Sequence, residues 1–208
     1  MRASFLYLLL PILISVLGCA SSNTSVNVDN QLNSDITVRN LLVLALTPID
    51  ENRETGEKEL VYWLKRGNYN ATASFDILTV RGRLPVREEV KRVLENNDFD
   101  GVLALRLVDF DESSRFVSSS EKNATNLNET YFYNYLNAWN GNYQPGYYSN
   151  SRLMVVESNL YTFPTGEIVH STISESFISD SFEGFAEDFS KATIKSLKRA
   201  KVLVKRED

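Results

Sequence analysis

Residues 40–46 read Asn-Leu-Leu-Val-Leu-Ala-Leu, an almost uninterrupted apolar run of strand length. Apolar side chains on both faces of a strand are typical of a parallel sheet that is covered on both sides. Residues 102–108, Val-Leu-Ala-Leu-Arg-Leu-Val, repeat the pattern. Two such strands, separated by segments with helical patterns, predict parallel β-α-β units with right-handed crossovers.

The segments between these two strands carry the helical patterns. The first, Asp50–Arg66, has apolar residues along one side and is expected to become helical around Glu54 and to end at Gly67. The second is expected to start at Pro85, which suits a first helical turn, and its valines and leucine recur at helical spacing. Residues 70–74 predict a weak strand at the edge of the sheet.

The carboxyl-terminal part of the chain changes pattern. Residues 153–161 and 167–176 are extended runs around the turn sequence Phe163-Pro-Thr-Gly166, which predicts an antiparallel hairpin. Residues 182–202 then predict an amphipathic helix. The predicted fold is a single α/β domain of the α+β kind. Its mixed sheet has the strand order 2-1-3 followed by the hairpin.

The basic residues of the last helix gather towards its carboxyl end, where the helix dipole favours cations. The cluster consists of Lys191, Lys195, Lys198, Arg199 and Lys201. A solvated helix end explains such a cluster, and this is the interpretation that the sequence favours.

A polar and aromatic insertion, residues 111–150, separates the two halves of the domain. Tyrosine and tryptophan mixed with asparagine and glycine are typical of binding loops. The candidate partner-binding residues are Tyr131, Tyr133, Tyr135, Trp139, Tyr143, Tyr147 and Tyr148. The expected partner is an envelope protein or a glycan. The alternative is a loop that partly covers the sheet edge or an unstructured excursion.

Residues 1–18 predict a secretory signal peptide, with Arg2 followed by an apolar run too short to span a bilayer. Val16-Leu-Gly-Cys19 resembles the bacterial lipobox. The resemblance implies cleavage between Gly18 and Cys19, with a diacylglycerol and an N-acyl chain, such as palmitate, on Cys19. It also implies the periplasmic face of the outer membrane, or alternatively the cell surface. A stray thiol is the alternative interpretation of Cys19.

Residues 19–36 predict a polar, flexible tether that leads to a single domain over residues 37–208. The full chain has a formal net charge of −5. This acidic balance argues against nucleic acid as a partner and against attraction to anionic lipids. Membrane attachment is therefore expected through the acyl chains.

Few residues suggest catalysis or metal binding. His170 is the only histidine and Cys19 the only cysteine, so no zinc ligand set is expected. Asp109, Asp111 and Glu112 follow an apolar strand at the edge where ligands bind in α/β sheets, but solvated loop charges explain them as well. No glycine-rich phosphate loop occurs. The sequence predicts no cofactor and no catalytic residue.

Three segments carry a wider resemblance. They are Asp100-Gly-Val-Leu-Ala-Leu-Arg-Leu-Val-Asp109, Val156-Glu-Ser-Asn-Leu-Tyr161 and Thr165-Gly-Glu-Ile-Val-His-Ser171. They resemble strand motifs of a largely uncharacterised group of bacterial envelope lipoproteins. The α/β domain of that group is similar to the TolB amino-terminal domain and to curli-secretion-type lipoproteins. In the last two motifs, Thr162 and His170 replace a common acidic residue and a tryptophan.

The resemblance and the missing catalytic sets imply a non-enzymatic binding or scaffolding lipoprotein of the cell envelope. Two alternatives stay open. One is an accessory lipoprotein in envelope assembly or secretion. The other is a glycan-acting hydrolase that uses Asp109 and Asp111 near His170.

Overall fold

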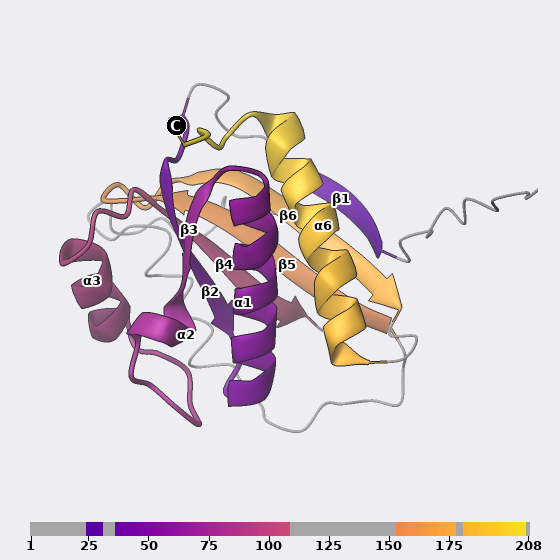
Figure 1. The fold of residues 1–208 in the computed structure, drawn as a ribbon, viewed down its shortest axis with the longest axis horizontal. Helices are drawn as coiled ribbons and strands as arrows, with labels where there is room; N and C mark the ends of the chain where they lie inside the picture. Colours follow the sequence, from indigo (N-terminus) through magenta and orange to yellow (C-terminus); the bar gives the residue numbers. More distant parts are fainter. Residues whose placement is uncertain (1–23, 31–35, 109–152, 178–180, 207–208) are drawn as a thin grey trace, which may run out of the picture.

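The computed structural model describes residues 24–30, 36–108, 153–177 and 181–206. They contain a six-stranded sheet in the order β1-β6-β5-β4-β2-β3 (Figure 1). The strands are β1 (Thr24–Asn30), β2 (Asn40–Leu46), β3 (Asn70–Ala73), β4 (Gly101–Val108), β5 (Leu153–Thr162) and β6 (Ile168–Phe177).

Strand β2 is parallel to β3 and β4, and the other neighbours in the sheet are antiparallel. The mixed α/β sheet is therefore confirmed, and so is the predicted order of the parallel strands with the hairpin beside them.

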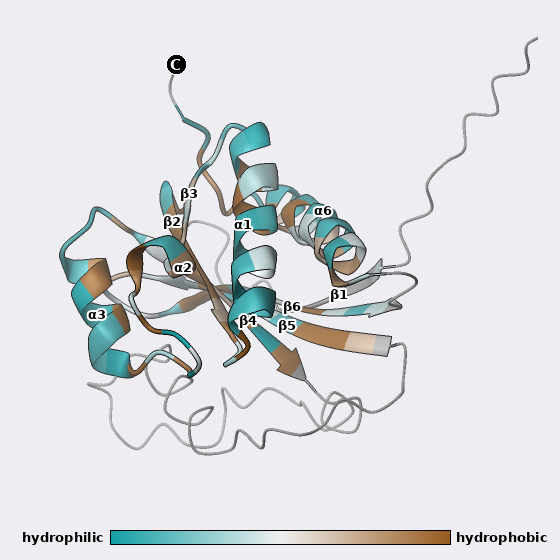
Figure 2. Ribbon diagram, turned by 60° about the horizontal axis from the view of Figure 1, so that its bottom comes forward, coloured by the Kyte–Doolittle hydropathy of each residue, from teal (hydrophilic) through white to brown (hydrophobic). Residues whose placement is uncertain are grey.

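Helices cover both faces of the sheet. They are α1 (Asp50–Arg66), α2 (Ser74–Ile77), α3 (Arg87–Glu95) and α6 (Phe182–Ala200). Helices α1 and α6 lie side by side on one face, whereas α3 lies on the other (Figures 1 and 2). None of the helices in these four ranges is long and apolar enough to cross a membrane.

The apolar run of β2 is explained by a core on each side of the sheet. Leu41, Val43 and Ala45 pack in the core beneath α1 and α6. The alternate residues Leu42, Leu44 and Leu46 pack in the core that contains Val90 and Leu94 of α3. Successive side chains of a strand point to opposite faces, so a strand covered on both sides needs no polar alternation.

A buried ion pair fixes the amino-terminal half of α1 on β2. Glu57 Oε1 accepts hydrogen bonds from the Ala45 amide at 2.9 Å and from Arg53 Nε at 3.1 Å. Glu57 Oε2 accepts one from the Phe75 amide at 2.6 Å, and Arg53 Nη1 donates to the Val80 carbonyl at 3.1 Å. The pair therefore ties α1 to β2, to α2 and to the chain that follows α2.

The structure differs from the predicted tether at residues 24–30. These residues form β1, which pairs antiparallel with β6 and closes that edge of the sheet. The serine, asparagine and aspartate content of this segment is typical of linkers, which is why its composition predicts a tether and not a strand. The edge of a sheet offers unpaired backbone N–H and C=O groups, and a segment with polar side chains can pair with them as well as an apolar one.

Three helix boundaries also differ from the prediction. Helix α1 begins at Asp50 rather than around Glu54. Helix α3 begins at Arg87, two residues after Pro85, and α6 ends at Ala200 rather than at residue 202. The short helix α2 was not predicted, because four residues give no readable period.

Candidate functional site: a basic groove between α1 and α6

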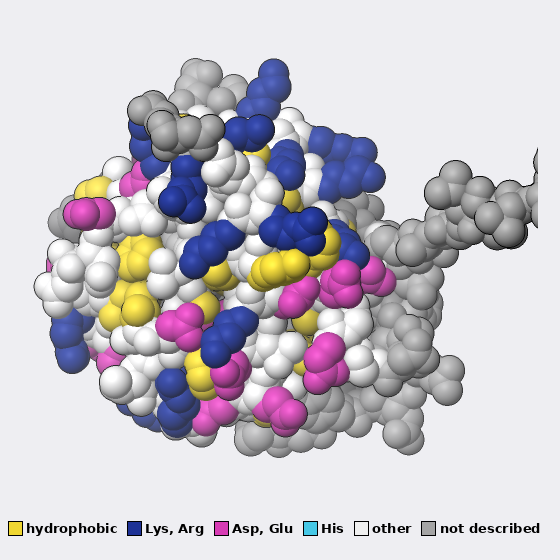
Figure 3. All heavy atoms as spheres, in the orientation of Figure 1, with side chains coloured by type: hydrophobic (Ala, Val, Ile, Leu, Met, Phe, Trp, Pro, Cys, Tyr) yellow, Lys and Arg dark blue, Asp and Glu magenta, His cyan; other side chains and the backbone are white. Residues whose placement is uncertain are grey.

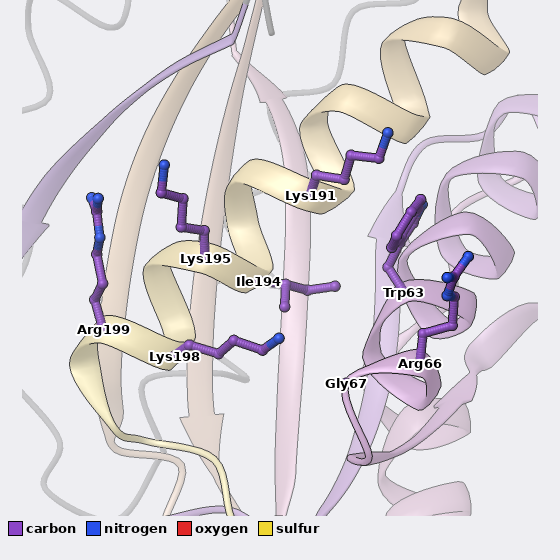
Figure 4. A pocket seen from close by; sticks show the side chains of 8 residues that line it. All are labelled: Trp63, Arg66, Gly67, Lys191, Ile194, Lys195, Lys198 and Arg199. Atoms are coloured by element: carbon purple, nitrogen blue, oxygen red, sulfur yellow. The ribbon is translucent and has the colours of Figure 1, made fainter. Parts of the chain in front are cut away.

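The carboxyl-terminal halves of α1 and α6 enclose a groove with a volume of about 590 Å³. Its lining includes Trp63, Arg66 and Gly67 from the end of α1, and Lys191, Ile194 and Lys198 from α6 (Figure 4). Lys195 and Arg199 of α6 complete the lining, and we call this surface the basic groove. Indole, isoleucine and lysine methylenes provide its apolar parts, while the charged groups remain in contact with solvent.

The cations of α6 form a stripe along the helix because they recur at i, i+4, i+7 and i+8. Figure 4 shows Lys191 and Lys198 extending towards α1, whereas Lys195 and Arg199 extend from the other side of α6. All four are exposed. The opposite side of α6 is buried through Phe185, Phe189 and Leu197, which fixes the direction of the stripe.

On the α1 side, Trp63 is the centre of the groove. Lys191 Nζ lies 4.7 Å and the Arg66 guanidinium carbon 5.0 Å from the indole centroid. The two cations approach the indole from opposite sides in Figure 4. The indole Nε1 donates to Glu59 Oε1 at 2.7 Å. Trp63 is thus oriented by a carboxylate and holds two cations by cation–π attraction.

The chain that follows α6 holds the ends of the two helices together. Val38 donates its amide to the Val202 carbonyl and accepts from the Val204 amide, at 2.8 and 2.9 Å. The Arg206 amide donates to the carbonyl of Asn68, just after α1, at 2.8 Å. These backbone contacts place the end of α6 beside the end of α1, so the groove is part of the folded framework.

Gly67 shapes the floor of the groove where α1 ends. A Cβ atom at this position would lie 3.0 Å from the ring carbons Cδ2 and Cε2 of Tyr69. The Tyr69 ring is buried, and Lys198 Nζ lies 5.7 Å from its centroid. The glycine therefore lets an aromatic ring pack directly beneath a cation of the groove.

Charge is distributed unevenly along the two helices. In α6 the acidic residues lie in the amino-terminal half and the basic residues from Lys191 onwards. In α1 the charges are mixed up to Glu59, and only Lys65 and Arg66 follow. Figure 3 shows Lys and Arg side chains gathered towards the upper right of the exposed face. Lys191 pairs with Glu187 at 2.5 Å. Within the part of the chain that the structure describes, Arg66, Lys195, Lys198 and Arg199 have no carboxylate within ion-pair distance. These four cations are available to an external anion.

The chain matches no family model and no curated protein sequence. Among solved structures, the chain is similar to two structures of the PelC dodecamer from Paraburkholderia phytofirmans. A PelC variant is 10% identical with a TM-score of 0.45, covering 81% of this chain and 94% of that one. The second structure is 10% identical with a TM-score of 0.44, covering 88% and 99%.

The predicted lipidation and partner-binding residues, and the acidic cluster of the hydrolase alternative, lie outside the described residues. They are Gly18 and Cys19, the aromatic residues between Tyr131 and Tyr148, and the acidic residues Asp109, Asp111 and Glu112. Across the described ranges, no group of three or more His, Cys, Asp or Glu side chains has the arrangement of a metal site.

His170 lies within the described residues, in β6, and is 3% exposed. Its Nε2 is 2.9 Å from the Oγ of Ser196 on α6, which is 6% exposed. Burial lowers the pKa of His170. A neutral imidazole that bonds to the neighbouring helix agrees with the prediction that this histidine is a packing residue, and the Ser196 contact adds a link between β6 and α6.

The sequence identifies the cations that α6 contributes to the basic groove, but it favours their interpretation as a solvated helix end. It misses the α1 side of the groove, since Trp63 and Arg66 lie in a helix that was read only for its apolar side. The spacing of Lys191, Lys195, Lys198 and Arg199 was a usable signal, because it places four cations on one strip of the helix surface. That α1 faces this strip follows from the tertiary structure.

Proposed function

We propose that the protein is a lipid-anchored, non-enzymatic binding component of the bacterial cell envelope, and that the basic groove takes up an anionic ligand. The observation that carries the binding role is the set of exposed cations from α1 and α6 that have no carboxylate partner in the described part of the chain. Guanidinium and ammonium groups bind phosphate and carboxylate groups by charge-assisted hydrogen bonds.

The groove is built for attraction rather than for chemistry. Its described lining offers cations, an indole and an isoleucine, but no nucleophile paired with a base. Binding by exposed cations weakens as salt rises, because charges separated by more than about 8 Å are screened at physiological ionic strength. The expected ligand interaction is therefore reversible and sensitive to salt.

The anchor in this proposal is the lipid on Cys19, placed on the periplasmic face of the outer membrane. Replacement of the thiol by Cys19→Ala removes the acceptor for the diacylglycerol. In a bacterium with two membranes, we expect the Cys19→Ala chain to lose labelling by radioactive palmitate and to leave the membrane fraction. Ser22→Ala, a change in the same segment, is the matched control and should behave like the natural sequence.

A Cys19→Ala chain that still sediments with membranes and still lacks residues 1–18 would show that another feature attaches and processes the protein. The envelope role would then need a different anchor, whereas the basic groove and its charge would be unaffected.

The insertion is proposed as a second contact, for an envelope protein or a glycan. Crosslinking in cells, with and without residues 118–150, tests this role through the neighbours that are captured. Capture of copies of this chain would instead favour the alternative of an oligomeric assembly or secretion accessory. The hydrolase alternative loses its histidine, because His170 is buried against α6.

A further inference from the structure

Strand β1 shortens the tether between Cys19 and the folded domain, because residues 24–30 belong to the sheet. Residues 24–30 pair with β6, and Thr24 Oγ1 is 2.8 Å from Ser176 Oγ. Only four residues separate Thr24 from Cys19 in the sequence. A fully extended chain spans at most about 3.6 Å per residue, so the five steps to Cys19 reach about 18 Å. On the proposed function, the domain is therefore held close to the membrane.

Helix α6 covers the sheet next to β1, and the tether and the groove lie towards opposite ends of this strand. The carboxyl-terminal half of α6 lies over the Asn30 end, because Asn30 pairs with Ser171 and the neighbouring His170 contacts Ser196, whereas Thr24 lies beside Ser176. Helix α6 packs against β1 and β6 on one side and against α1 on the other. Lys195 and Arg199 extend from the side of α6 away from α1, so the positive charge continues from the groove across the helix (Figure 4). Tethering raises the local concentration of any group on the membrane surface that these cations can reach.

Trp63 argues against recognition of a neutral sugar in the groove. Arg66 and Lys191 approach the indole from opposite sides, so a sugar ring that stacks on Trp63 has to displace one of these cations. Charge is therefore the property that the groove presents to a ligand. Clusters of lysine and arginine beside a membrane attract anionic lipids, and the effect adds with each cation.

We infer, on the basis of the proposed function, that the basic groove docks onto phosphate headgroups of anionic phospholipids in the membrane that carries the acyl anchor. The side of the domain formed by α1 and α6, which carries these cations, lies against the bilayer. The lipid anchor supplies attachment, and the groove sets the orientation of the domain.

The test uses the chain from residue 20 to Asp208, which keeps every described residue and carries no lipid. Its binding is measured by co-sedimentation with vesicles of phosphatidylcholine alone, or of phosphatidylcholine with an equal amount of phosphatidylglycerol. We expect binding to the mixed vesicles only, and a loss of that binding at high salt. Equal binding to both vesicles, or binding to neither, overturns the inference.

Two double variants with the same change in net charge locate the binding surface. Lys195→Glu with Lys198→Glu reverses two cations of the groove, and we expect affinity for the mixed vesicles to fall at least about 30-fold. Lys91→Glu with Arg92→Glu reverses two exposed cations on α3, at the other face of the sheet, and should change affinity less than about threefold. An equal loss in both variants assigns binding to net charge and overturns the inference.

Binding of soluble anions shows whether the groove recognises lipid headgroups, free phosphate or an acidic glycan. Groove-dependent binding of inorganic phosphate, or of an acidic polysaccharide such as polygalacturonate, without vesicle binding would assign the groove to a soluble ligand or a glycan and overturn the membrane docking. Because the vesicle test uses a chain without Cys19, it can fail while the lipid anchor is confirmed in cells, and the reverse also holds.

Discussion

Arg53 and Glu57 show how a single pair of charges can hold a framework. Both side chains are 0% exposed, and Glu57 accepts from two backbone amides as well as from Arg53 and Ser74. Burial raises the pKa of Glu57, and the Arg53 charge together with these hydrogen bonds opposes the rise. Such a pair is costly to break, because the remaining charge stays buried without a partner.

We predict that Arg53→Met lowers the free energy of unfolding by about 3–5 kcal/mol, because Glu57 is left uncompensated. Urea denaturation measures the change. The matched control is Lys58→Met on the same helix, where Lys58 pairs with Glu54 at 2.6 Å but both side chains are nearly half exposed. Exposed pairs are screened by water and salt, so the control should be almost neutral. Similar losses in both variants would contradict a special role for the buried pair.

His170 makes stability depend on pH, because burial lowers its pKa in the folded state. The unfolded chain then binds the proton more tightly, so this contribution to stability is complete above about pH 6.5 and is lost as the pH falls below it. Between pH 6.5 and 5 we expect the free energy of unfolding to fall by up to about 1.4 kcal/mol per pH unit.

His170→Leu should flatten this dependence, although its absolute stability will be lower without the Ser196 contact. His170 is the only histidine in the chain, whereas Glu57, whose pKa is raised, is present in both chains, so the difference between their slopes isolates the histidine. Denaturation curves at several pH values compare the slopes. Equal slopes for the natural sequence and the variant would show that His170 does not control this interval.

At the level of elements, two glycines differ in the space around them: a side chain would clash at Gly101 but not at Gly56. Gly101 starts β4, and a Cβ atom there would lie 2.6 Å from Val38 Cγ1 and 3.1 Å from the Tyr161 carbonyl oxygen. Gly56 lies within α1, and a Cβ atom there would meet nothing within 4 Å. The first glycine is required by close packing between strands, whereas the second only adds backbone entropy to the unfolded state.

We predict that Gly101→Ala destabilises the fold by about 1–3 kcal/mol through overpacking, whereas Gly56→Ala stabilises it by about 0.5–1 kcal/mol. Thermal and urea unfolding of both variants measure the two effects. A neutral Gly101→Ala would mean that β4 and the chain before β2 can separate at no cost. That result would weaken the link that also positions the end of α6.

At the scale of the whole molecule, the net charge does not describe the local charge at the basic groove. The chain is acidic overall, yet its cations gather where α1 and α6 end. A net charge of −5 opposes attraction to anionic surfaces only where the charge is evenly spread. A surface with a local cluster attracts an anion at short range, because screening limits the influence of distant acidic groups. The vesicle experiment is therefore decided by the groove and not by the net charge.

By itself, the sequence determined the alternation of strands and helices, the parallel and antiparallel halves of the sheet, and the buried face of α6. These features follow from local periodicity and turn residues, which a single chain displays directly. Only the tertiary structure decided that β1 completes the sheet, that Arg53 and Glu57 are buried, and that Trp63 faces Lys191. These contacts join residues whose own segments look like a linker or a solvated helix surface. Their roles depend on what lies opposite them in space, and no local pattern encodes that.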